Sequence, residues 1–289
     1  LQLDADMYHL HDVELLPIGL LLRARGKHVI YDAHEHMPRC VLSRPYLTPG
    51  SRKLLSWFID GLERFSVRHL SGVIAAYPSI ADRLSPFNPR TVIVSNYALR
   101  DELSLQTSKP WRARSMSVAY VGGISESRGL MEMVEAMTHL EPNCGAKLKL
   151  AGDFRPSELR ERAIRLPGWK HVCEMGWLSR MEMADLFGDV RAGLLLFLPV
   201  PHHVQAQPNK LFEYMSAGIP VIASDFPLWR EIVDEVGCGL VVDPREPTAI
   251  ARAIEYVLGN PREAEKMGRL GRQAVVNTYN WSVEADKLV

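Results

Sequence analysis

A glycine pair followed by an arginine is the first feature of the sequence that suits an anion. In Ala119–Gly129 an apolar stretch leads into Gly122 and Gly123, and Arg128 follows. Glycines allow close approach of a ligand to the backbone, a helix N-terminus favours negative charge, and a guanidinium can bind phosphate through two hydrogen bonds. An ordinary strand-to-helix turn explains the glycine pair equally well. The segment matches neither G-x-G-x-x-G nor the P-loop, which disfavours a Rossmann dehydrogenase or a P-loop NTPase.

A second segment, Gln207–Asp225, places Lys210 and Glu213 three residues apart near the start of a predicted helix. Pro208 suits that start and Gly218 the helix end. Residues three apart share a helix face, and a cation beside the positive end of the helix gains nothing from the helix, so an external anion is a suitable partner. A carboxylate on this face could accept hydrogen bonds from sugar hydroxyls. The alternative is a surface Lys–Glu pair without a ligand.

Histidines gather near the N-terminus: His9 and His11 lie two apart beside Asp12, and His34 and His36 flank Glu35. Residues two apart share one face of a strand, so either pair could chelate a metal ion. This pattern would suit a metallohydrolase. We weigh that alternative least, because the glycine, lysine and glutamate pattern of the second half would then have no function.

The elements that must position these residues alternate between short β-branched runs and longer helical patterns, which is typical of an α/β protein with parallel sheets. The predicted strands are Met7–Leu10, His28–Asp32, Gly72–Ala76, Thr91–Val94, Ser117–Val121, Lys147–Ala151, His171–Met175, Ala192–Leu198, Pro220–Ala223 and Gly239–Val242. The predicted helices are Leu15–Arg25, Ser51–Leu70, Leu130–Leu140, Pro156–Leu166, Arg180–Gly188, Lys210–Ser216, Leu228–Val233, Pro247–Leu258, Pro261–Thr278 and a last one from Val283. Together they predict two Rossmann-like, doubly wound domains.

The polar stretch Arg100–Ser115 separates the two series and predicts a linker. We therefore expect a first domain with its linker over residues 1–112 and a second domain with closing helices over 113–289. Four strands are few for a doubly wound domain, and the chain begins with Leu1 rather than methionine. We expect the first domain to lack about three N-terminal βα units and the chain alone to show little turnover.

The composition excludes several classes of protein. The chain has 289 residues, and its 34 basic and 34 acidic side chains cancel, which disfavours general binding of nucleic acid. Its apolar runs are too short to span a bilayer, and no signal peptide is visible. The four cysteines show no C-x-x-C spacing, so neither a zinc site nor a disulfide framework is indicated. We expect a cytoplasmic protein.

The helix Ser51–Leu70 allows a peripheral membrane contact. Its apolar stripe predicts packing against the core: Leu54, Phe58, Leu62 and Phe65. Its remaining faces hold Arg52, Lys53, Trp57, Arg64 and Arg68. Residues 39–100 contain 9 basic and 3 acidic side chains, so this region is basic although the whole chain is neutral. A solvated face is the simpler explanation, and contact with the inner face of the plasma membrane is the alternative.

Taken together, several motifs resemble family 4 glycosyltransferases. They are VGG-x4-RG from Val121, GWLS from Gly176 and PNKLFEYMSAGIPVIASDFPLWREI from Pro208, with YHLHDVELLPIG and VIYDAHEH in the first domain. The resemblance implies the GT-B fold and transfer of a sugar from a nucleotide sugar with retention of anomeric configuration and without a bound metal. It also implies an acceptor-binding first domain and a donor-binding second domain.

The resemblance also implies roles for individual residues. The donor diphosphate would meet Arg128 and Lys210, the ribose hydroxyls would meet Glu213, and the base would meet backbone between Gly176 and Leu178. Asn209 would contact sugar or phosphate, His11 would face the donor sugar, and His34 and Glu35 would lie near the acceptor.

Two positions depart from the family pattern. Gln205 stands where the first glutamate of the E-x7-E motif is expected, and Gly123 replaces the first basic residue of the phosphate loop. Both changes affect the sugar and phosphate contacts, and Lys210 could supply the missing charge.

The function implied is transfer of a hexose from a UDP- or GDP-sugar to a hydroxyl of a polysaccharide or lipid-linked acceptor, in cell-surface polysaccharide or glycolipid biosynthesis. One alternative is a GT-B nucleotide-sugar epimerase, which would need acid and base carboxylates in its cleft. Another is a paralogue that binds nucleotide without catalysis, an idea favoured by Gln205.

Overall fold

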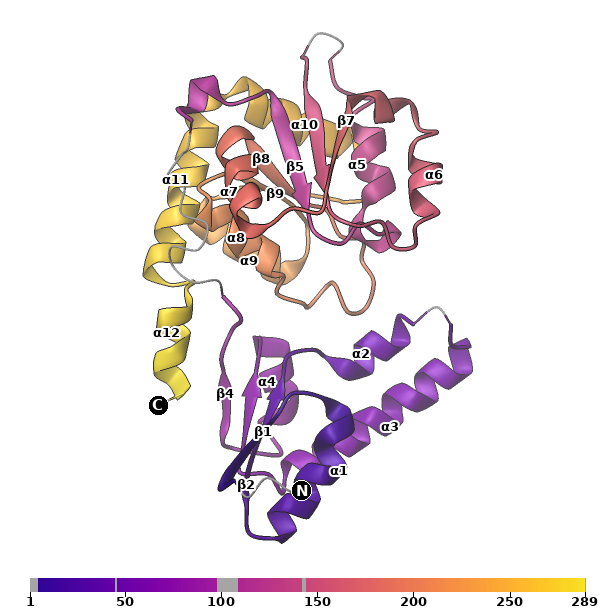
Figure 1. The fold of residues 1–289 in the computed structure, drawn as a ribbon, viewed down its shortest axis with the longest axis vertical. Coiled ribbons are helices and arrows are strands. Elements are labelled where there is room, and N and C mark those ends of the chain that lie inside the picture. Colours follow the sequence, from indigo (N-terminus) through magenta and orange to yellow (C-terminus); the bar gives the residue numbers. More distant parts are fainter. Residues whose placement is uncertain (1–4, 45, 98–108, 142–143, 289) are drawn as a thin grey trace. The chain divides into compact units, whose positions relative to one another are not determined.

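The computed structural model describes residues 5–44, 46–97, 109–141 and 144–288, which form two compact units (Figure 1). Unit 1 comprises Leu1–Asn96, Val200–Ala206 and Val283–Val289, and unit 2 comprises Tyr97–Pro199 and Gln207–Ser282. The predicted boundary after residue 112 differs from this division, since unit 2 starts earlier and the chain end returns to unit 1. A hydrogen bond fixes that return: the backbone N–H of Ser95 donates to Oε2 of the buried Glu284 at 2.7 Å.

Unit 1 is a parallel four-stranded sheet in the order β1-β2-β3-β4 with helices on its core face. Its strands are β1 (Met7–Leu10), β2 (His28–Ala33), β3 (Gly72–Ala75) and β4 (Thr91–Ile93). Its helices are α1 (Leu16–Ala24), α2 (Met37–Leu42), α3 (Pro49–Val67) and α4 (Pro78–Leu84), and the short helix α12 (Trp281–Ala285) leads into the C-terminal segment. The helices α2 and α4 were not predicted from the sequence.

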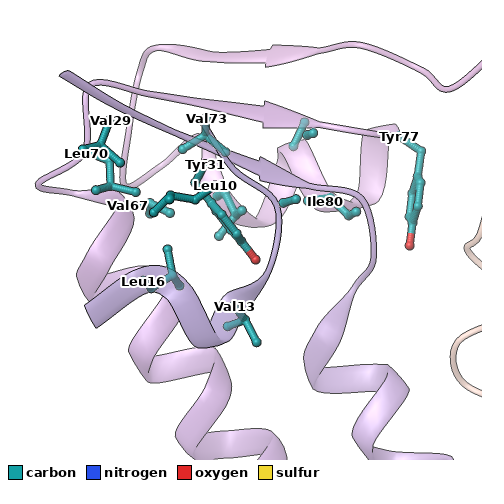
Figure 2. Packing of buried hydrophobic residues seen from close by; sticks show 14 of the residues in the cluster. Leu10, Val13, Leu16, Val29, Tyr31, Val67, Leu70, Val73, Tyr77 and Ile80 are labelled. Carbon is teal, nitrogen blue, oxygen red and sulfur yellow. The ribbon is translucent and has the colours of Figure 1, made fainter. Parts of the chain in front are cut away.

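The strands follow one another in sequence order, so right-handed crossovers place their connecting helices on one face. The hydrophobic cluster agrees, because it combines residues of α1, α3 and α4 with the strand residues of a single face. Figure 2 shows Leu16 and Val67 lying against Leu10, Tyr31 and Val73 of the sheet.

The predicted packing of the α3 stripe is wrong. Leu54, Phe58 and Phe65 are 68%, 59% and 53% exposed, and only Leu62 of that stripe packs against the core. The buried side of α3 consists instead of Glu63, Ser66 and Val67. The helix is therefore rotated relative to the expectation, because a charged residue occupies its inner face.

That inner glutamate belongs to a buried polar cluster. The Tyr31 hydroxyl donates to Oε1 of Glu63 at 2.9 Å, and Nη2 of Arg83 lies 3.0 Å from Oε2. Nη1 of Arg83 donates to Asp60 at 3.0 Å. Burial raises the pKa of Glu63, while Arg83 and Tyr31 act in the opposite direction. The cluster joins β2, α3 and α4 and satisfies a carboxylate that has no exposed surface.

Unit 2 is a parallel six-stranded sheet in the order β10-β9-β8-β5-β6-β7. Its strands are β5 (Ser117–Val121), β6 (Lys147–Ala151), β7 (Val172–Gly176), β8 (Ala192–Leu195), β9 (Val221–Ser224) and β10 (Gly239–Val242). The chain builds outward from β5 to β7 and then returns to β8 on the other side of β5. This reversal confirms the doubly wound prediction for unit 2, and ligands bind beyond the carboxyl ends of strands at such a point.

The helices of unit 2 cover its sheet as predicted, with two shorter than expected. They are α5 (Leu130–Ala136), α6 (Leu159–Ala163), α7 (Arg180–Asp189), α8 (Asn209–Ser216), α9 (Pro227–Val236), α10 (Pro247–Gly259) and α11 (Pro261–Asn277). α5 does not reach Leu140, and α6 replaces the predicted Pro156–Leu166. Among the helices of the described residues, none is long and apolar enough to cross a membrane.

Candidate functional site

A pocket of about 360 Å³ opens in unit 2 beyond the carboxyl ends of β5, β6 and β7. It lies at the edge of the sheet where the reversal between β5 and β8 predicts a ligand. The lining comes from the loops after these strands and from α7 and α8: Val121, Gly122, Gly123, Ala151, Gly152, Asp153, Arg155, Trp177, Leu178, Arg180, Met183, Lys210 and Glu213.

Lys210 comes from the first turn of α8 and extends over the glycine loop. A Cβ atom at Gly122 would lie 2.5 Å from Nζ of Lys210, so a side chain at this position would displace the ammonium group. Gly122 also has a φ of +121°, which side chains rarely adopt. Burial lowers the pKa of Lys210 to about 8, Arg128 contributes to the decrease, and Glu213 opposes it. A partly buried cation that lies beside another cation is suited to an anionic ligand.

Arg128 lies beside the second glycine of the loop. Its Nη1 donates to the carbonyl oxygen of Gly123 at 3.0 Å, and a Cβ atom at Gly123 would lie 2.6 Å from that nitrogen. The guanidinium also lies over the ring of Phe197 at 5.6 Å. The structure thus gives a reason for glycine at the position where the family pattern has a basic residue, because the arginine side chain fills that space.

Glu213 projects from α8, one turn beyond Lys210. Its Oε1 accepts a hydrogen bond from Nη1 of Arg180 at 2.6 Å, and its side chain is 13% exposed. Arg180 begins α7, where Ser179 and Glu182 form a capping box. The arginine was missed from the sequence, because the contact joins residues that are 33 positions apart.

The structure brings five of the predicted donor residues together in the pocket lining: Gly122, Gly123, Leu178, Lys210 and Glu213. Arg128 contacts the loop behind them. Gly176, Asn209 and Gln205 are not part of the lining, and the segment that contains Gln205 belongs to unit 1.

The pocket also contains residues that sequence reasoning missed. Asp153 and Arg155 follow β6, and Trp177 follows β7 with 72% of its surface exposed. Their position directly after predicted strands was a usable signal, because the carboxyl ends of parallel strands meet at one edge of the sheet.

The remaining predicted residues lie in unit 1, at the carboxyl ends of β1 and β2. Nδ1 of His11 is 3.4 Å from Oδ2 of Asp32, and the rings of His11 and His34 have centroids 6.2 Å apart. Sγ of Cys40 lies 3.5 Å from Oε2 of Glu35. These contacts bring His11 and His34 to the same edge of the sheet.

A comparison of the sequence with models of known protein families identifies the family of this chain. The profile of the family described as glycosyl transferases group 1 matches residues 105–274, which is more than half of the chain. The chain belongs to this family. The recognition of a glycosyltransferase from the sequence motifs is thereby confirmed.

Three curated relatives come from species of Mycobacterium and Mycolicibacterium. The chain is 23% identical over 80% of its length to a glycogen synthase of Mycobacterium tuberculosis, and covers 56% of that protein. It is 22% identical over 96% of its length to an MMP α-(1→4)-mannosyltransferase of Mycolicibacterium hassiacum, of which it covers 68%. It is 34% identical over 60% of its length to a phosphatidyl-myo-inositol mannosyltransferase of Mycobacterium leprae, of which it covers 45%.

Solved structures show the same fold. A sucrose-phosphate synthase from Thermosynechococcus elongatus has a TM-score of 0.75 at 20% identity, over 99% of this chain and 73% of that one. HepE of Anabaena in complex with UDP has a TM-score of 0.76 at 14% identity, over 99% and 78% of the two chains. The family member therefore has the GT-B fold that was predicted, with two parallel sheets and their helices.

Proposed function

We propose that this protein transfers a hexose from a UDP- or GDP-sugar to a hydroxyl group of a polysaccharide or lipid-linked acceptor, with retention of configuration. The observation that supports this most is the pocket in unit 2, where Lys210 lies over the glycine loop and Glu213 lines the same wall. We further propose that Arg128 and Lys210 hold the diphosphate and that Glu213 binds the ribose. We also propose that His11 faces the donor sugar and that His34 and Glu35 lie near the acceptor.

The chemistry of the leaving group explains why two cations are needed. Breaking the anomeric bond places negative charge on the β-phosphate of the departing nucleotide. Preorganised cations stabilise that developing charge more than they stabilise the intact donor, which accelerates the reaction. Lys210 and Arg128 lie at neighbouring glycines, and Arg128 is anchored by its hydrogen bond to the carbonyl oxygen of Gly123. The transfer proposed here needs no metal ion.

Product analysis tests the proposal. The purified chain, and the same protein with any upstream coding sequence restored, would be incubated with UDP- and GDP-sugars and candidate acceptors. Retaining transfer predicts release of UDP or GDP together with a glycosylated acceptor whose anomeric configuration equals that of the donor. Release of a free sugar epimer would support the epimerase alternative, and binding without turnover by the restored protein would support a non-catalytic paralogue.

Trp177 is expected to stack on the base of the donor. Its indole is exposed at the mouth of the pocket, next to the backbone that we assign to the base. Stacking of a base on an aromatic ring contributes about 1–3 kcal/mol. We expect Trp177→Ala to weaken nucleotide binding accordingly in calorimetry, Trp177→Phe to retain most of it, and Met181→Ala, an exposed control on α7, to leave it unchanged. Unchanged affinity in Trp177→Ala would exclude the stacking contact.

We also propose that α3 binds the anionic inner face of the plasma membrane, which makes the protein cytoplasmic and peripheral. Trp57 and Phe58 are 74% and 59% exposed, on the side of the helix opposite its buried residues. Lys53 and Arg64 are exposed along the same helix, and the exposed Arg68 directly follows its last residue. Aromatic side chains together with cations suit the interface of an anionic bilayer.

Liposome flotation tests this contact. Burying a large apolar side chain stabilises by about 1.5–3 kcal/mol, so we expect Trp57→Ser with Phe58→Ser to reduce vesicle binding at least about tenfold. Tyr256→Ser, which removes an exposed aromatic side chain of unit 2, should bind vesicles like the unchanged protein. Equal binding to vesicles with and without anionic lipid would exclude the proposed membrane contact.

A further inference from the structure

Three potential metal ligands converge in unit 1, outside the donor pocket. Oδ2 of Asp32 lies 3.4 Å from Nε2 of His9 and 3.4 Å from Nδ1 of His11. The three donor atoms all lie within 4.8 Å of one another, and the two imidazole rings stack with centroids 4.5 Å apart. In the described part of the chain this is the single group of three such residues, and its carboxylate comes from Asp32 rather than from Asp12.

The fold explains why these residues meet. β1 and β2 pair in parallel with His9 opposite Ile30 and Leu10 opposite Tyr31, so Asp32 follows in register beside His11. Leu10 and Tyr31 point into the core (Figure 2), and side chains alternate along a strand. His9, His11 and Asp32 therefore share the face of the sheet that points away from the core, at the carboxyl ends of both strands.

We propose that His9, His11 and Asp32 bind a divalent transition-metal ion of the zinc type. Two imidazoles and one carboxylate form a donor set typical of zinc, and Mg²⁺ and Ca²⁺ prefer oxygen ligands throughout. In a tetrahedral site with metal–ligand bonds of about 2.0–2.1 Å, neighbouring donors lie roughly 3.4 Å apart. The two distances to Asp32 have this value.

The site leaves room for a further ligand. The side chains of His9, His11 and Asp32 are 43%, 58% and 22% exposed, so solvent or a small molecule can reach the fourth position. The ion would bind Nδ1 of His11 and leave Nε2 of that ring accessible. The proposed sugar transfer itself needs no metal ion. His11 belongs both to this site and to the residues proposed for sugar transfer, so metal retention is measured directly and independently of turnover.

Metal retention by the whole chain tests the inference. The protein would be stripped with a chelator, loaded with Zn²⁺, gel-filtered and analysed for bound metal, and Co²⁺ would be loaded in parallel as a spectroscopic probe. We expect one Zn²⁺ per chain, and a visible Co²⁺ spectrum without the charge-transfer band of a thiolate, because no cysteine belongs to the site. His9→Ala and Asp32→Asn should each weaken binding at least about tenfold, since even the loss of a residue that only supports a ligand costs 10–100-fold.

His28→Ala is the matched control, because His28 is an exposed histidine at the start of β2 outside the cluster. It should bind Zn²⁺ like the unchanged protein. Circular dichroism of each variant would show that its fold is retained, and His9 is exposed enough to be replaced without loss of packing. The inference is overturned if the unchanged protein retains no Zn²⁺, or if either His9→Ala or Asp32→Asn binds the ion with unchanged affinity.

Discussion

Replacing Lys210 with alanine is expected to lower kcat by about 10²–10³, equivalent to about 2.7–4 kcal/mol of transition-state stabilisation. The ammonium lies over Gly122, in the pocket that we assign to the diphosphate, and the charge on that group increases as the sugar leaves. The effect should therefore appear in kcat rather than in KM alone. Steady-state kinetics with a saturating acceptor would measure it, and wild-type kcat in this variant would refute the assignment.

A matched control and a pH profile separate this role from a general loss of positive charge. Lys147→Ala removes an exposed lysine of the same unit and should leave kcat unchanged. Because the pKa of Lys210 is lowered to about 8, the free protein loses this charge as pH rises through that value, and nucleotide affinity should fall with it. Lys210→Arg keeps the charge throughout and should show a flatter pH profile.

Replacing Arg83 with methionine is expected to destabilise unit 1 by about 3–5 kcal/mol, because removal of one partner leaves a buried charge uncompensated. Glu63 has no exposed surface and would keep only the Tyr31 hydroxyl as a hydrogen-bond donor among the contacts described. Methionine fills much of the space of the arginine stem, so the loss reflects charge rather than a cavity. Chemical denaturation followed by circular dichroism would measure the change.

Two further variants and the pH dependence test this explanation. Arg83→Met combined with Glu63→Gln should recover much of the loss, and Arg64→Ala should cost under about 1 kcal/mol because Arg64 pairs with Asp60 at the surface. A raised folded-state pKa means that the folded state favours protonated Glu63. The destabilisation in Arg83→Met should then grow as pH rises above the ordinary value of 4.5 and diminish in acid. A loss independent of pH would contradict a cause in the Glu63 charge.

The sequence predicts the strands and the position of the glycine loop after β5 well, because both depend on local signals. Short apolar or alternating runs give all ten strands of the described chain to within a few residues. The glycine pair with Lys210 and Glu213 gives much of the pocket lining. The family motifs add the order of these features along the chain. The α/β class therefore follows from the periodicity of the residues, and the GT-B fold follows from the resemblance of the motifs to the family.

The contacts that were missed depend on packing between distant segments. The period of α3 predicts an amphipathic helix but does not determine which side faces the sheet, since Tyr31 and Arg83 stabilise Glu63 on the inner side. In the same way, the pairing of Arg180 with Glu213 and of His11 with Asp32 requires the sheet to be assembled. Asp153 and Trp177 closely follow predicted strands, but their meeting in one pocket also requires those strands to lie beside each other.

The glycine loop of the pocket has one more consequence. The charged ends of Lys210 and Arg128 occupy the space that a Cβ atom at Gly122 and at Gly123 would fill. Each cation therefore lies where it does because its neighbouring residue has no side chain. An uncharged methyl group added at either position would push a positive charge out of place. The positions of both cations in this pocket thus depend on the two glycines as well as on the ionisable residues themselves. A mutational scan of the pocket should therefore include Gly122 and Gly123 beside the charged positions.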